Sequence, residues 1–174
     1  GTCRNYYFDV GILFDVAGIN KEFRKKAAEE FLAMLKNKGS SLFVFRHNYD
    51  EFLQIVESCI NWIESSYYDP SKASITLLFF KDEGYSAADL QLFISNIPEI
   101  LKKNHVEIVN IPDPNLAQAH QIGRDDLKRI ILDTYNLYGP FFDLEEREDT
   151  LDRDITSIES IYKLRKGSAS TNLN

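Results

Sequence analysis

The pattern that most constrains this chain is an alternation of short, nearly continuous apolar runs with longer segments of helical periodicity. Residues 5–9 and residues 41–45 are typical of buried strands, and an amphipathic helical pattern follows each of them. Strands that alternate with helices in this way form a parallel sheet. We therefore predict an α/β fold, a three-layer α/β/α arrangement around a central parallel sheet, with residues 5–9 as an interior strand.

Helical periodicity defines most of the remaining chain. We expect Phe23, Ala27, Phe31 and Met34 or Leu35 to face the core from a helix over residues 21–38, and a second helix to open at Asn48. Residues 74–80 fit a strand or a buried helix, and residues 106–111 fit a strand. Further helices are expected over 87–103, 125–138 and 150–166. This predicts one domain over 1–167 with a helical insertion at about 65–140, and a flexible tail at 168–174.

Composition narrows the class of protein. The chain has 174 residues, of which 44% are hydrophobic, so it can bury a core without disulfides, and its two cysteines are too few for a disulfide framework. No apolar run approaches the roughly 18 residues that span a bilayer. We expect a cytoplasmic protein with no membrane partner. The net charge of -7 argues against a broad basic face for nucleic acid.

Three carboxylates could carry chemistry. Asp9 follows the first strand, and ligands of parallel α/β sheets bind beyond the carboxyl ends of strands. The alternative is that Asp9 only caps the following turn. Glu51 shares a helical stripe with Ile55 and Cys59, so it leans toward the core, whereas Asp50 should point to solvent. The alternative for Glu51 is a capping box with Asn48.

Asp154 is the inward-leaning acid of the last helix. Steps of four and three residues lead from it to Ile158 and Ile161, whereas Asp152 lies on a polar stripe and should point to solvent. An inward carboxylate is costly unless a cation or a donor meets it, so the alternatives are a structural salt bridge and a metal ion.

Asp9, Glu51 and Asp154 come from separate elements and could converge beside the sheet. An all-oxygen set of ligands suits a hard divalent cation, so we expect Mg²⁺ or Mn²⁺.

These segments resemble the PIN-like nuclease domain, in particular bacterial variants with a long helical insertion. Residues 7–13 look like the family's opening strand with its Asp, and residues 42–51 are similar to its second strand and the helix that brings a Glu. Residues 153–158, with 164–167, look like the helix that carries the third acid.

The resemblance implies a divalent-metal-dependent nuclease that hydrolyses phosphodiester bonds, with Asp9, Glu51 and Asp154 as metal ligands and catalytic residues. It implies a nucleic acid substrate, with RNA favoured over DNA. Val10 and Gly11 stand where the family has hydroxyl and amide side chains that brace the site, so only their backbone groups can serve here. The family's fourth acid has no clear counterpart.

Other functions are compatible with the same residues. The domain could be a catalytically inactive recognition or scaffolding module, or a site completed by another segment or subunit, in a homo-oligomer or a larger protein. Residues 8–13 also resemble the opening of haloacid-dehalogenase phosphatases, in which Asp is the nucleophile. Gly11 occupies the place of the second Asp of that motif, which makes this the lower alternative.

Overall fold

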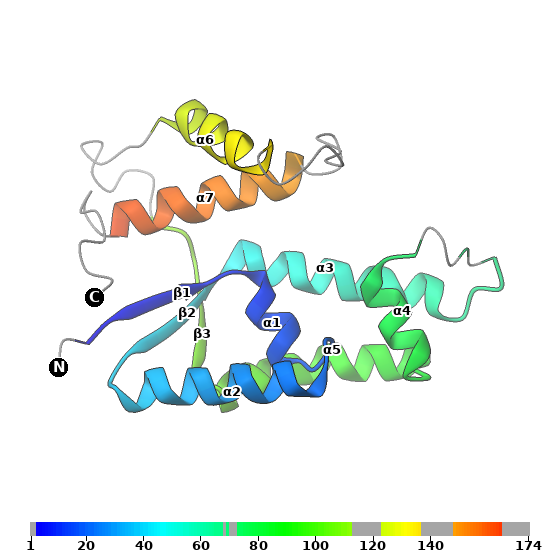
Figure 1. Cartoon of the computed structure of the whole chain (residues 1–174). Coiled ribbons are helices and arrows are strands. Elements are labelled where there is room, and N and C mark those ends of the chain that lie inside the picture. The colour runs from blue at the N-terminus through cyan, green and yellow to red at the C-terminus, as the bar shows by residue number, and fades with distance from the viewer. Residues whose placement is uncertain (1–2, 68, 70–72, 113–122, 137–147, 165–174) are drawn as a thin grey trace. The chain divides into compact units, whose positions relative to one another are not determined.

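The computed structural model describes residues 3–67, 69, 73–112, 123–136 and 148–164, and the chain divides into two compact units, residues 1–109 and 110–174. The first unit is an α/β fold (Figure 1). Its elements, in chain order, are β1 (Asn5–Phe8), α1 (Val10–Val16), α2 (Glu22–Asn37), β2 (Ser41–Phe45), α3 (Arg46–Ile63), α4 (Ile75–Asp82), α5 (Ala87–Lys103) and β3 (Val106–Val109). The described part of the second unit contains α6 (Arg124–Asn136) and α7 (Glu148–Leu164).

The three described strands form a parallel sheet in the order β1-β2-β3. This confirms the predicted α/β class with a parallel sheet, and the arrangement is compatible with three α/β/α layers. The predicted interior position of the first strand is wrong for the described sheet, because β2 lies at the centre and β1 at the edge. The apolar run in β1 reflects contacts on both faces of that strand, which a central position would equally require.

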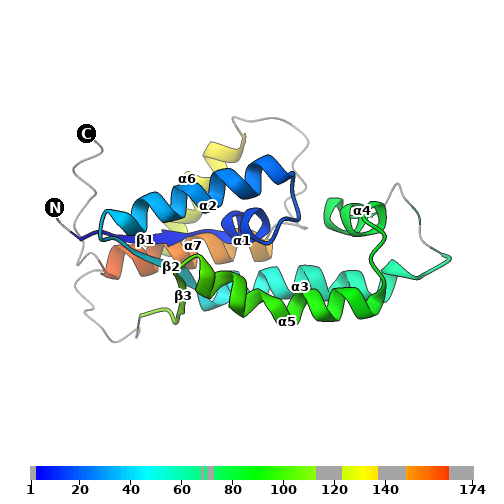
Figure 2. The ribbon, with the colours of Figure 1, turned by 90° about the horizontal axis from the view of Figure 1, so that it is seen from below.

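Side chains alternate between the two faces of the sheet, as the pleat requires. Leu42, Val44 and Val106 are buried in the main core, and Tyr6, Phe8 and Ile108 pack against it. On this face lie α2 and α5 (Figure 1, Figure 2). On the opposite face the ring of Tyr7 stacks on Phe43 and Phe45, with centroid distances of 5.2 and 5.1 Å.

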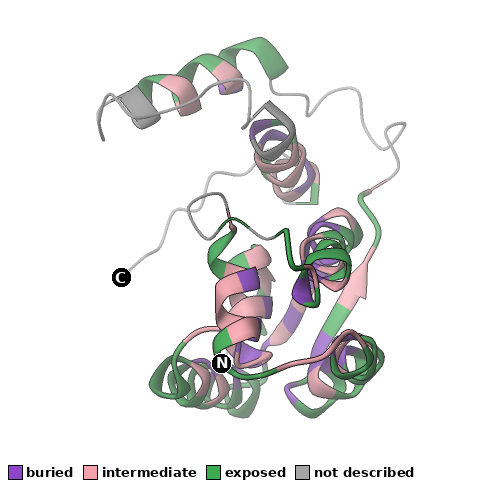
Figure 3. Cartoon of the chain, turned by 90° about the vertical axis from the view of Figure 1, so that its right-hand side faces the viewer, coloured by how far each residue is buried: buried purple, intermediate pink, exposed green. Residues whose placement is uncertain are grey.

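Helix α2 carries two neighbouring apolar stripes, and the structure buries the one that the sequence did not favour. Ala28, Leu32 and Leu35 face the core, whereas Phe23, Phe31 and Met34 are 66%, 44% and 43% exposed. The expected inward stripe is therefore wrong except for Leu35. The helices of this unit are each buried on one side and exposed on the other, as Figure 3 shows.

The structure settles the alternative that the sequence left open for residues 74–80 and also shows the helix that follows. Residues 74–80 belong to a helix, α4, whose first turn is capped by Ser74: its Oγ accepts a hydrogen bond from the Leu77 N–H at 3.1 Å. Phe80 of this helix is fully buried among Tyr85 and Phe93, at centroid distances of 5.1 and 5.3 Å. The predicted helix over residues 87–103 is confirmed as α5.

A capping box starts α5, and we expect Ser86→Ala to lower the free energy of unfolding by about 1 kcal/mol. The Ser86 Oγ accepts from the Asp89 N–H at 3.2 Å, and the Ser86 N–H and hydroxyl donate to Asp89 Oδ2 at 2.8 and 2.7 Å. A control on the same helix is Ser95→Ala, because the Ser95 hydroxyl only bonds back to the Leu92 carbonyl, an interaction that adds little. Urea unfolding of both variants measures the difference.

The cap should also make the effect of Ser86→Ala depend on pH. Hydrogen bonds from Ser86 hold the pKa of Asp89 below its ordinary value. A carboxyl group with a lowered folded-state pKa contributes stability above its unfolded pKa and loses it as the pH falls through the folded value. The difference between wild type and Ser86→Ala should therefore be full at neutral pH and shrink below about pH 4, near the ordinary Asp pKa. A difference that is constant down to that range would contradict this.

The described part of the second unit is a pair of helices. Leu127 of α6 is buried with Leu151 and Ile155 of α7. Arg124 joins the two helices, since its guanidinium contacts Asp152 Oδ1 at 3.2 Å and Glu159 Oε2 at 2.7 Å. The predicted helices over 125–138 and 150–166 correspond to α6 and α7, whose bounds lie slightly earlier in the chain. The predicted tail at 168–174 lies outside the described residues.

Candidate functional site

The carboxyl edge of the sheet brings together the starts of two helices. Phe8 of β1 is paired with Val44 of β2, and both strands run in the same direction, so α1 and α3 leave the sheet at the same edge. The two helices then pack on each other, with the rings of Phe14 and Phe52 at 5.0 Å. Asp9 directly follows β1 at this edge, where ligands of parallel α/β sheets bind, and Glu51 is the sixth residue of α3.

Asp9 is the N-cap of α1, and its carboxylate is exposed. The Val10 N–H donates to Oδ1 at 2.7 Å, which confirms the capping role that was one of the two interpretations. Among the described residues no other group donates to this carboxylate. The backbone N–H of Val10 thus orients the Asp9 carboxylate.

Glu51 is held inside, and it does not belong to a capping box. Helix α3 begins at Arg46, two residues before the predicted start, so Asn48 is a helical residue and not the N-cap. Glu51 is only 9% exposed and Asn48 only 2%, whereas Asp50 is exposed. The helical-stripe argument is therefore confirmed for Glu51 and Asp50. Buried polar side chains are costly unless they are paired, and Asn48 and Glu51 both have interaction partners.

Asp154 lies on α7 of the second unit and is half-buried, between a buried and an exposed stripe. The buried residues of this helix include Leu151 and Ile155, while Ile158 is 39% exposed, so the expected inward stripe through Ile158 is wrong. The Asp152 side chain is 66% exposed, as predicted, although it also pairs with Arg124. Convergence of Asp154 with Asp9 and Glu51 stays a prediction.

The donor set at the edge of the sheet fits a hard cation by its chemistry. Asp9 and Glu51 offer only carboxylate oxygens, the ligands that Mg²⁺ and Mn²⁺ prefer. Among the described residues there is no group of three or more His, Cys, Asp or Glu with the geometry of a metal site. That Asp9 and Glu51 bind one cation stays a prediction.

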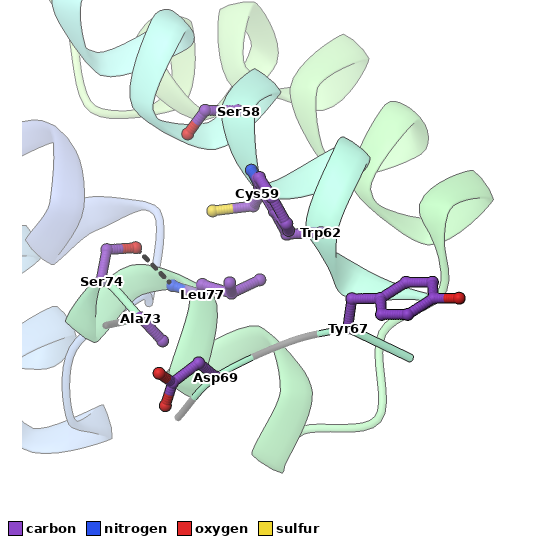
Figure 4. A pocket seen from close by; sticks show the side chains of 8 residues that line it. All are labelled: Ser58, Cys59, Trp62, Tyr67, Asp69, Ala73, Ser74 and Leu77. Atoms are coloured by element: carbon purple, nitrogen blue, oxygen red, sulfur yellow. Dashed lines mark hydrogen bonds between the residues drawn. The ribbon is translucent and has the colours of Figure 1, made fainter. Parts of the chain in front are cut away.

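A pocket of about 430 Å³ opens farther along α3, and the sequence analysis did not foresee it. Its described lining comes from α3, from α4 and from the connection between them: Ser58, Cys59, Trp62, Tyr67, Asp69, Ala73, Ser74 and Leu77 (Figure 4). Burial raises the pKa of the Cys59 thiol, so this group remains protonated and forms an apolar wall.

No helix within the described residues combines the length and the apolar character needed to cross a membrane. Comparison with protein-family models, with curated proteins and with solved structures finds no match for this chain.

Proposed function

We propose that this protein is a divalent-metal-dependent nuclease that hydrolyses phosphodiester bonds, with RNA favoured over DNA as the substrate. The observation that carries the proposal is that Asp9 directly follows β1 and that the buried Glu51 lies on α3, the helix that follows the adjacent parallel strand β2. The resemblance of the residues around these acids to the PIN-like domain supports the same function, with Asp154 as the third ligand.

The residues of the chain have distinct roles in this proposal. Asp9 and Glu51 would hold Mg²⁺ or Mn²⁺, with Asp154 completing the set, and a bound ion would activate water and stabilise the leaving oxygen. The Val10 N–H fixes the orientation of the Asp9 carboxylate. Because Val10 and Gly11 lack the bracing side chains of the resembled family, we expect slow cleavage, reduced by about 10- to 100-fold as is common for outer-shell changes.

Metal binding is tested by thermal unfolding in Mn²⁺. A retained site should raise the unfolding temperature of the wild type, since a ligand at 100 times its Kd stabilises the folded state by about 2.7 kcal/mol. Glu51→Gln should remove most of this shift because it removes an anionic ligand. Glu57→Gln is the matched control, since Glu57 is exposed on the same helix and should leave the shift intact.

The outcome that contradicts the site is a shift of equal size in wild type and Glu51→Gln, which would place the ion elsewhere. Activity is tested in parallel with labelled single-stranded RNA and DNA, each with Mn²⁺ and with EDTA. Cleavage that persists in EDTA would overturn the metal mechanism.

A recognition module is the second candidate function, favoured by the apolar stripe on α2. Phe23, Phe31 and Met34 are exposed on this helix, and exposed stripes of this kind are typical of surfaces that bind partners. Absence of cleavage in every metal, together with absence of a Mn²⁺ shift, would favour this function over the nuclease.

A further inference from the structure

We infer that the pocket between α3 and α4 binds a nucleobase of the substrate strand, with Trp62 as the stacking surface. This inference rests on the proposed nuclease function for the identity of the ligand. The pocket itself lies entirely within the first unit, and its volume of about 430 Å³ is in the range of small-molecule sites.

The lining favours a flat ring over a sugar or a phosphate. The Ser58 hydroxyl and the Cys59 thiol both donate to the Ile55 carbonyl, at 2.7 and 3.3 Å, and the Ser74 Oγ accepts from the Leu77 N–H. These polar side chains thus form hydrogen bonds with backbone groups of the helices, as the Ser74 bond in Figure 4 illustrates. What remains for a ligand is mostly apolar surface from Trp62, Ala73 and Leu77.

The charge of the lining points in the same direction. Asp69 brings a carboxylate, and the described lining contains no Lys or Arg. The N–H groups on the edge of a base are compatible with a nearby carboxylate. The Trp62 side chain is 52% exposed, which leaves its ring accessible. Tyr67 is 90% exposed and its ring points away from the other lining residues (Figure 4), so Trp62 provides the stacking surface.

Helix α3 fixes the distance between this pocket and the proposed catalytic edge. Trp62 follows Glu51 by 11 residues on one stripe, with Ile55 and Ser58 between them at steps of four and three residues. At a rise of about 1.5 Å per residue, the two Cα positions lie about 16 Å apart along the helix axis. A strand whose scissile phosphate meets Glu51 can therefore place a base a few nucleotides away at Trp62.

Stacking would also give an acidic protein affinity for a nucleic acid. With a net charge of -7, this protein lacks the excess of cations that normally supplies affinity for phosphates. Stacking on aromatic side chains is sequence-tolerant and needs no basic face. Binding through Trp62 should accordingly depend weakly on salt.

Trp62 is the sole tryptophan of the chain, so its fluorescence reports directly on the pocket. We expect adenosine and guanosine to quench it in a saturable way without metal, and inorganic phosphate to leave it unchanged. Trp62→Ala should weaken binding of a labelled single-stranded RNA, measured in EDTA by fluorescence anisotropy, by roughly 5- to 150-fold, the range for loss of one stacked base. Trp62→Phe should retain part of the affinity because a ring remains.

The matched control is Leu92→Ala, since Leu92 is 62% exposed on α5 of the same unit and should not change RNA affinity. Circular dichroism of each variant checks the fold. Two results would contradict base binding in this pocket while supporting the nuclease function, if the wild type shows metal-dependent cleavage. One is the absence of quenching by nucleosides, and the other is an unchanged RNA affinity in Trp62→Ala. Saturable quenching without any metal-dependent cleavage would support ring binding at Trp62 and remove the proposed nuclease function.

Discussion

Asp9→Asn should abolish metal-dependent cleavage, with a loss of more than about 100-fold, beyond the 10- to 100-fold typical of outer-shell groups. The substitution removes the anionic charge that would hold the cation, and with it the activation of water. It should leave the fold intact, because an Asn Oδ1 can accept the same hydrogen bond from the Val10 N–H and Asn is as good an N-cap as Asp. The variant therefore separates catalysis from capping.

The measurement is the initial rate on labelled single-stranded RNA in Mn²⁺, alongside the unfolding temperature in EDTA. Asp50→Asn provides the control. Asp50 is exposed beside Glu51, so this variant should cleave RNA at the wild-type rate. A wild-type rate in Asp9→Asn would show that the carboxylate serves only as the cap of α1. Equal losses in the two Asn variants would mean that general charge, and not this ligand, controls the reaction.

Phe80→Ala should lower the free energy of unfolding of the first unit by about 3 to 5 kcal/mol, the usual cost of removing a buried Phe. Phe80 is fully buried and packs against Tyr85 and Phe93, so its loss leaves a cavity that these rings fill only in part. Because small proteins are stable by only about 5 to 15 kcal/mol, this is a large fraction of the total.

Ile75→Ala on the same helix is the control for this prediction. Ile75 is 85% exposed, so its truncation should change the free energy of unfolding by less than about 0.5 kcal/mol. Urea unfolding followed by the fluorescence of Trp62 reports on the first unit, because Trp62 belongs to it. Similar costs for Phe80→Ala and Ile75→Ala would contradict the packing of α4 against α5.

Much of the candidate site could be predicted from spacing alone. Helical periodicity separated Glu51 from Asp50 correctly, because a step of one residue turns the side chain by about 100° and so moves it to another face. The same reasoning misplaced the start of α3, since Asn48 offered a plausible cap signal although the helix begins at Arg46. A cap signal is weak because the same residue types also occur inside helices when tertiary contacts bury them.

The sequence by itself determined the α/β class, the parallel sheet and the existence of nearly every element. Alternating apolar runs and helical periods are local properties, and in β2 and α5 they matched the structure residue for residue. The place of Asp9 after β1 follows from the same local pattern, because a carboxylate that follows a strand necessarily lies at its carboxyl end.

Only the tertiary structure decided between local patterns of equal strength. Helix α2 has two adjacent apolar stripes, and contacts with the rest of the first unit select the stripe through Leu32 over the one through Phe31. The edge position of β1 and the pocket beside Trp62 likewise depend on residues far apart in the chain. Periodicity identifies the sides of an element that can be buried, but the choice among them depends on the shape of the surface against which the element packs.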